Sequence, residues 1–158
     1  MMQTWFEAKL KYMKVTESGS EQMTTETFLL DAVSFTDAES RMIAQAQQMV
    51  KGGEFTVKDI KQSNISEVFP YEVGEWWWKA KVNLVTVDEE AGREKKISVY
   101  HAVEADDAKE ALQRLDECLD YMVIPYEVVT LNRTTIADIF PYDLEEHAKE
   151  WEDKKEGE

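Results

Sequence analysis

The sequence predicts an α+β protein in which a ββαβ unit of about 70 residues occurs twice in tandem. Three observations support this prediction. Blocks of sequence recur in the same order in both halves, two segments alternate between apolar and polar residues, and each half has one segment with helical periodicity. We expect both helices to pack on one face of a single antiparallel or mixed sheet, with a pseudo-twofold axis between the units.

The recurrence is collinear over three blocks. Residues 5–12, 32–38 and 65–71 match residues 77–84, 102–108 and 136–142, respectively. The offset between partners changes only from 72 to 70 to 71 residues, so the loops of the two halves differ little in length. We therefore predict repeat units at residues 5–71 and 77–142, within one pseudo-symmetric domain that spans residues 1–142.

Each unit begins with the two-residue period of a half-buried strand. Apolar and polar residues alternate over residues 6–12, and the pattern returns over residues 78–84. A polar, glycine-containing segment follows in both units, and then a second β-rich segment at residues 25–35 and 95–103. Each unit therefore opens with a long antiparallel hairpin that has one face on the core and one face toward water.

A helix is expected after each hairpin. In the first unit, Thr36 and Glu39 have the spacing of a capping box, and Gly52 and Gly53 follow the last residue of the apolar stripe. In the second unit, Asp106 or its neighbour is the predicted cap, and an apolar stripe runs on to a proline. Both stripes have helical spacing, which predicts helices with one buried face.

A third strand is expected after each helix, at residues 54–61 and 126–132. The segments that follow, residues 63–67 and 134–138, have the pattern of single capped helical turns before a Phe-Pro-Tyr stop. These turns would complete each unit without adding a strand to the sheet.

Composition restricts the class of protein. The chain has 158 residues, 33 acidic against 18 basic, a net charge of −15 and one cysteine. No apolar run approaches the roughly 20 residues that cross a bilayer, and the start of the chain lacks the pattern of a signal peptide. We expect a cytoplasmic protein with no membrane span and no internal disulfide. Residues 143–158 carry 8 acids and 3 bases and are expected to form an acidic C-terminal tail.

The residues that could support catalysis do not form a recognisable motif. His101 lies in the second strand of the second unit, where the first unit has Asp31, and it is expected to be a partly exposed strand residue rather than a general base. Cys118 lies in the apolar helical stripe among acidic neighbours, which favours a core residue over a nucleophile. No metal-ligand spacing and no phosphate-binding glycine loop is present. We expect no enzymatic activity, no metal and no cofactor.

Three consecutive tryptophans, residues 76–78, are the most unusual feature of the chain. By alternation, Trp77 faces away from the helix side of its strand, with Lys79 and Lys81 on the same face. In the first unit, Trp5 takes the corresponding place with Lys9 and Lys11.

Two interpretations of these strands stay open. The two aromatic-plus-lysine strands resemble a platform that stacks single-stranded nucleic acid, but so acidic a protein repels polyphosphate. In the other interpretation the indoles pack at the junction between the units or beneath the tail.

Protein–protein association is the leading hypothesis from the sequence. An uncovered sheet face and an acidic tail favour docking on a basic partner, or acting as an acidic decoy for nucleic-acid-binding machinery. The same face could also pair with a second copy of the chain as a homodimer. Single-stranded nucleic-acid binding through Trp5, Lys9, Lys11, Trp77, Lys79 and Lys81 is the alternative.

The repeat blocks also carry a family resemblance. With WFEAKLKY at residues 5–12, EFTV at 54–57, ISEVF at 65–69 and WWKAKV at 77–82, the chain resembles a family of similar length from gut anaerobic bacteria and their phages. This family is known only as a domain of unknown function, and the resemblance covers about residues 5–142. It implies a phage- or mobile-element-related setting and supplies no catalytic residue.

Overall fold

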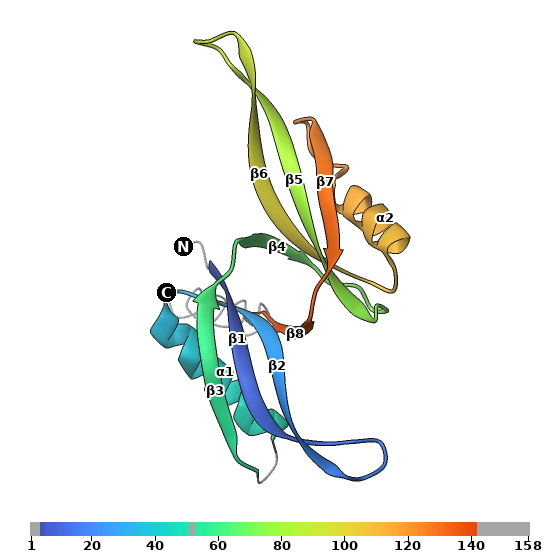
Figure 1. Ribbon diagram of the computed structural model, residues 1–158. Coiled ribbons are helices and arrows are strands. Elements are labelled where there is room, and N and C mark those ends of the chain that lie inside the picture. The colour runs from blue at the N-terminus through green and yellow to red at the C-terminus, as the bar shows by residue number, and fades with distance from the viewer. Residues whose placement is uncertain (1–3, 51–52, 142–158) are drawn as a thin grey trace, which may run out of the picture.

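The computed structural model describes residues 4–50 and 53–141. It contains two four-stranded sheets, and each sheet carries one helix on one face. Figure 1 shows these two lobes end to end, with their long hairpins pointing in opposite directions. The α+β class is therefore confirmed.

Lobe A is built mostly from the first half of the chain. Its strands β1 (Thr4–Val15) and β2 (Glu21–Ala32) form the hairpin, helix α1 (Phe35–Met49) follows, and β3 (Phe55–Gln62) pairs with the outer side of β1. Lobe B repeats this order with β5 (Trp76–Asp88), β6 (Arg93–Ala105), α2 (Ala108–Leu119) and β7 (Tyr126–Arg133).

The remaining two strands cross between the lobes. Strand β4 (Ile65–Phe69) leaves lobe A and pairs in parallel with β6 of lobe B, and β8 (Ile136–Phe140) leaves lobe B and pairs in parallel with β2 of lobe A. The strand orders are β3-β1-β2-β8 and β4-β6-β5-β7, so each sheet is completed by a strand from the other half. This reciprocal exchange joins the lobes through backbone hydrogen bonds.

The exchange corrects two expectations. Residues 65–69 and 136–140 are strands rather than single helical turns, because their backbone groups find partners in the opposite half of the chain. The single sheet is also wrong: eight strands form two sheets, and each helix covers its own sheet. Local sequence contains no signal for a pairing partner more than thirty residues away.

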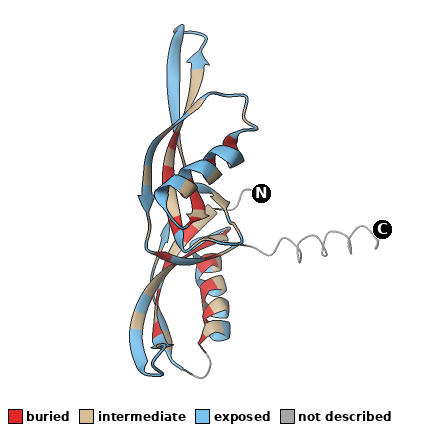
Figure 2. Ribbon diagram, turned by 90° about the vertical axis from the view of Figure 1, so that its right-hand side faces the viewer, coloured by how far each residue is buried: buried red, intermediate tan, exposed pale blue. Residues whose placement is uncertain are grey.

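Each lobe has its own core between helix and sheet. The apolar side of β1 packs on Ala38, Met42 and Ala46 of α1, and the matching side of β5 packs on Leu115 and Leu119 of α2. Figure 2 shows buried residues between each helix and its strands and near the middle of the molecule, whereas both hairpin ends are exposed. The alternation of the first strands is therefore confirmed in both lobes.

The helices begin in the same way. The Ser34 hydroxyl accepts the Asp37 N–H at 3.1 Å, and the Asp107 carboxylate accepts the Glu110 N–H at 2.8 Å. Asp107 is the expected neighbour of Asp106, but in lobe A the cap is Ser34 rather than Thr36. Helix α1 starts at Phe35, and Thr36 therefore already lies inside its first turn.

The lobes also agree in detail. The register between β1 and β3 shifts at Lys9/Leu10, and that between β5 and β7 shifts at Lys81/Val82. Both hairpin turns contain a glycine with positive φ, Gly19 and Gly92, a conformation that disfavours other residues. Descent of the two units from one duplicated sequence stays a prediction.

No described helix is long and apolar enough to cross a membrane. The predicted tail, residues 143–158, lies outside the described residues.

Candidate functional site

The two tryptophans proposed for stacking lie at the junction between the lobes. Trp77 is only 6% exposed and packs in a junction core, whose buried members are Leu29, Ile65, Trp77, Ala102, Ile136 and Ile139. Trp5 is half-buried against the same core. Trp77 lies on the face that alternation assigned to it, and strands β4 and β8 bring apolar residues onto that face. Of the two interpretations of these strands, the one that packs the indoles at the junction between the units is therefore confirmed for Trp77 and Trp5.

The other two indoles of residues 76–78 differ in their surroundings. Trp78 lies on the helix side, and its Nε1 donates to the Ala105 carbonyl at 3.0 Å. By alternation Trp76 belongs to the same side as Trp78, but it is 37% exposed, and the Arg133 guanidinium lies 4.4 Å from its ring centroid. Trp76 is the first residue of β5, and at this end its ring is covered by an arginine rather than by the core.

The four predicted binding lysines keep their expected faces in two separate sheets. Lys9 is exposed and Lys11 is half-buried on β1. Lys79 and Lys81 are half-buried on β5, and the Lys79 ammonium lies 5.0 Å from the centroid of the Tyr100 ring. The structure therefore leaves these lysines on the surface but removes Trp77 from it.

His101 is buried rather than partly exposed. The register places it opposite Ala80, as Phe28 lies opposite Ala8, so its counterpart in lobe A is Phe28 and not Asp31. Its ring packs on Phe69 of β4 with centroids 5.3 Å apart. The Nδ1 atom is buried and has no hydrogen-bond partner among the described residues, and burial lowers the pKa of His101 below its ordinary value.

Cys118 is half-buried in lobe B beside Tyr71. Its Sγ lies 3.4 Å from the Tyr71 hydroxyl, which also donates to the Arg114 carbonyl at 3.2 Å. This thiol contact, together with burial, raises the pKa of Tyr71 to about 12. The contact of the thiol is with a hydroxyl rather than with a base, and a half-buried thiol in such a contact is typical of a packing residue.

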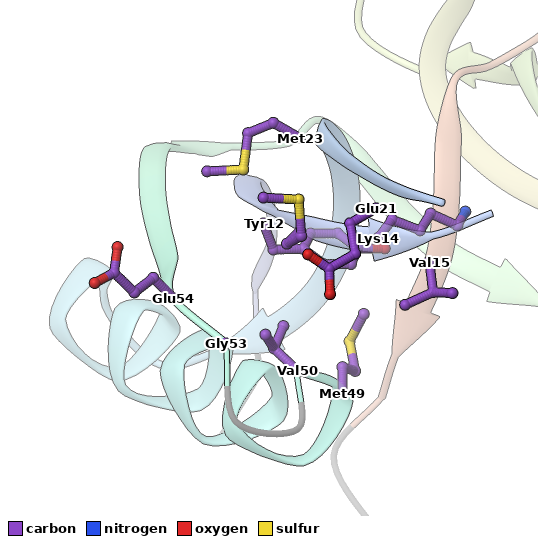
Figure 3. A pocket seen from close by; sticks show the side chains of 10 residues that line it. Tyr12, Lys14, Val15, Glu21, Met23, Met49, Val50, Gly53 and Glu54 are labelled. Carbon is purple, nitrogen blue, oxygen red and sulfur yellow. The ribbon is translucent and has the colours of Figure 1, made fainter. Parts of the chain in front are cut away.

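A hollow lies at the far end of lobe A, between the hairpin and the C-terminal end of α1 (Figure 3). Its volume is about 640 Å³. Three methionines from three elements line it: Met13 of β1, Met23 of β2 and Met49 of α1. Met13 and Met23 face each other across the hairpin and are 39% and 49% exposed. We call this hollow the methionine groove.

Polar residues surround the methionine groove. The Tyr12 hydroxyl donates to the Glu26 carboxylate, and burial together with this carboxylate raises the pKa of Tyr12 above its ordinary value. Lys14 pairs with the same carboxylate at 3.5 Å. Glu21 and Glu54 also line the groove, and neither has an ion-pair partner among residues 4–50 and 53–141.

Sequence reasoning did not predict this site. Alternation along β1 places Met13 on the face opposite α1, but only the fold shows that Met23, Met49 and the start of the connection to β3 converge there. An observable signal was the presence of methionines near the ends of three successive elements. Exposed methionine in one hollow is typical of adaptable binding surfaces.

The comparison with protein families identifies the chain. A domain of unknown function, DUF4494, matches residues 4–142. The chain belongs to the DUF4494 family. The expected resemblance to a family of unknown function is confirmed at this level. Comparisons with curated proteins and with solved structures find no match.

Proposed function

We propose that this DUF4494 protein is a non-enzymatic binding protein that associates with another protein through the methionine groove. The observation that supports the proposal best is the convergence of three methionines, two of them well exposed, in a hollow of about 640 Å³. Solvent-exposed apolar side chains that share one hollow are the usual mark of an interaction site. Unbranched methionine side chains can repack around different partner residues.

The partner is a different protein rather than a second copy of this chain. Two copies that each carry a net charge of −15 repel one another. The long edge strands β3 and β7 also each contain a bulge, at Lys58 and Val129, and bulges disfavour the pairing of sheet edges. The protein then acts as an acidic docking or decoy surface. In the phage- or mobile-element-related, cytoplasmic setting that the sequence suggests, its target is basic, nucleic-acid-binding machinery.

Single-stranded nucleic-acid binding is the second candidate. Lys9, Lys11, Lys79 and Lys81 lie on the surface, and Tyr100 offers a ring beside Lys79. Stacking through Trp77 would require the junction core to open, because that indole is buried. Titration with a single-stranded oligonucleotide at low and high salt, followed by tryptophan fluorescence, tests this candidate. Salt-sensitive quenching that Lys79→Gln and Lys81→Gln abolish would favour it over protein association.

Selection from a displayed random-peptide library tests the leading proposal. The wild-type protein is expected to enrich related apolar peptides, and Met13→Lys is expected to abolish this enrichment because it places a charge in the groove. The control is Val85→Lys, since Val85 takes the place of Met13 in lobe B.

The selection has two results that would contradict protein association through the groove. Enrichment that survives Met13→Lys places the contact elsewhere, and the absence of enrichment on the wild-type protein opposes binding of this kind. Sedimentation analysis completes the test: we expect a monomer, and a dimer that Met13→Lys dissociates would show that a second copy fills the groove.

A further inference from the structure

We infer that the partner segment in the methionine groove is a short apolar stretch flanked by lysine or arginine. This inference rests on the proposed function and adds the charge of the occupant. It follows from the floor of the groove, from the carboxylates around it and from the helix end beside it.

The floor of the groove selects apolar side chains. Met13 and Met23 are register partners on the hairpin, and Met49 approaches from the last turn of α1. Val15 and Val50 extend the apolar lining on either side. An aliphatic or aromatic side chain of a partner would remove these exposed apolar surfaces from water, which is the main source of affinity in such a contact.

The carboxylates around the floor select cations. Figure 3 shows the Glu21 carboxylate above Met49 and Val50, whereas Glu54 lies at the far edge of the lining and extends away from these side chains. Lys14 extends away from the hollow and pairs with Glu26, so it does not neutralise either of them. A partner that carries acidic groups here would be repelled, whereas lysine or arginine beside the apolar anchor would pair with these carboxylates.

The end of α1 adds to the negative potential. A helix carries a partial negative charge at its C-terminus, and the last turn of α1 contains no basic residue that would offset it. Met49 and Val50, which end the helix, are both part of the groove lining. The groove therefore presents an apolar floor, the Glu21 carboxylate and a helix C-terminus to the same occupant, with Glu54 at its edge.

Lobe B differs at the corresponding place. By register, Val85 replaces Met13 and Lys96 replaces Met23, so a cation stands where lobe A has an apolar side chain. Lys96 pairs with Glu127 at 3.0 Å, so an ion-paired cation takes the place of Met23 in lobe B. We therefore expect one basic-flanked segment to bind each chain, on lobe A.

Three labelled synthetic peptides test the inference by fluorescence anisotropy with the full-length protein. The first has an Ile-Leu-Leu core between lysines, the second has the same core between glutamates, and the third has a serine core between lysines. We expect the first to bind at least about tenfold more tightly than the other two, and its affinity to fall as salt increases. Saturation is expected at one peptide per chain.

Charge-reversal variants then test whether the preference for lysine-flanked peptides comes from the groove. Glu21→Lys is expected to weaken the lysine-flanked peptide by about tenfold and to strengthen the glutamate-flanked one. Glu94→Lys is the matched control, because Glu94 takes the place of Glu21 in lobe B and changes the net charge without touching the groove. The control is expected to leave the affinity nearly unchanged.

Two groups of results would overturn the inference. Equal binding of lysine- and glutamate-flanked peptides, lost in Met13→Lys, would retain protein association through the groove but refute its preference for basic flanks. An equal loss in Glu94→Lys would show an effect of overall charge rather than of the groove. A failure of all three peptides, together with a library selection that enriches nothing, would overturn the proposed function as well.

Discussion

The two lobes share one architecture but differ in the ring that contacts the phenylalanine of the exchanged strand. In lobe A, Phe140 of β8 stacks on Phe28 with ring centroids 5.1 Å apart. In lobe B, Phe69 of β4 meets His101 at nearly the same separation, 5.3 Å. The strand exchange is therefore the same in both lobes, but at this contact lobe B buries a polar atom without a hydrogen-bond partner among the described residues, the Nδ1 of His101. Such an atom lowers the free energy of unfolding, because it loses its hydrogen bond to water when the protein folds.

The lobes also differ at their far ends. Lobe A carries the methionine groove with Glu21 and Glu54, whereas lobe B has Val85, Lys96 and an ion pair at the register-equivalent positions. The shared parts of the lobes are those that hold the sheets and helices together. The ends that differ are the places where we propose that a specific partner is recognised.

A substitution at the junction between the lobes should lower the free energy of unfolding most. Trp77→Ala removes the largest side chain of the junction core and is expected to lower the free energy of unfolding by about 3 to 5 kcal/mol. Trp5→Ala, at the half-buried counterpart, should cost less. Urea denaturation followed by circular dichroism measures both. A cost for Trp77→Ala below that of Trp5→Ala would refute the asymmetry of the junction.

Replacing the Phe28 ring of lobe A by the imidazole found in lobe B should give the next largest loss of stability. Phe28→His places an imidazole beneath Phe140 and is expected to cost about 2 to 4 kcal/mol, because an apolar ring is lost and a polar atom is buried. The same denaturation experiment applies. A change below about 0.5 kcal/mol would show that the site under β8 tolerates a polar ring.

The reverse exchange in lobe B should stabilise the protein. His101→Phe recreates the pair found in lobe A and removes the unpartnered Nδ1, so we expect a gain of about 1 kcal/mol near pH 7. A loss of stability would show instead that the space under β4 does not accept the larger ring.

Stability should depend on pH through His101 of lobe B, whereas the equivalent residue of lobe A, Phe28, does not titrate. Burial lowers the pKa of His101 in the folded state, so the unfolded chain binds a proton more readily than the folded chain does. The free energy of unfolding should therefore fall as the pH drops through the ordinary histidine range, about 6.5, toward the folded-state value. Denaturation at a series of pH values measures this slope. His101→Phe should reduce it, and an unchanged slope would assign it to other groups.

The smallest effect on stability is expected in the groove itself. Met13→Ser changes a surface residue and should alter the free energy of unfolding by no more than about 0.5 kcal/mol. The same variant should lose binding of the lysine-flanked peptide. A large loss of stability would assign Met13 a structural role and weaken the case for a binding site.

Local periodicity was sufficient to predict the first strand and the helix of each lobe. The alternation of residues 6–12 and 78–84 predicted the first strand of each lobe, and the apolar stripes predicted both helices. Period-two alternation also assigned Trp77 to the face opposite α2. These features follow from the spacing of apolar and polar residues that are neighbours in the sequence, and so they can be predicted without knowledge of the tertiary contacts.

In contrast, the residues that cover each sheet face and the pairing of the last strand of each half follow from the three-dimensional fold. Residues 65–69 and 136–140 are too short to reveal their state locally, and they become strands because a free sheet edge of the other half accepts them. This exchange buries Trp77, places His101 beneath Phe69 and divides the expected single sheet into two. The methionine groove likewise depends on three elements meeting in space. Pairing and packing between distant segments depend on the whole chain, and local sequence patterns do not encode them.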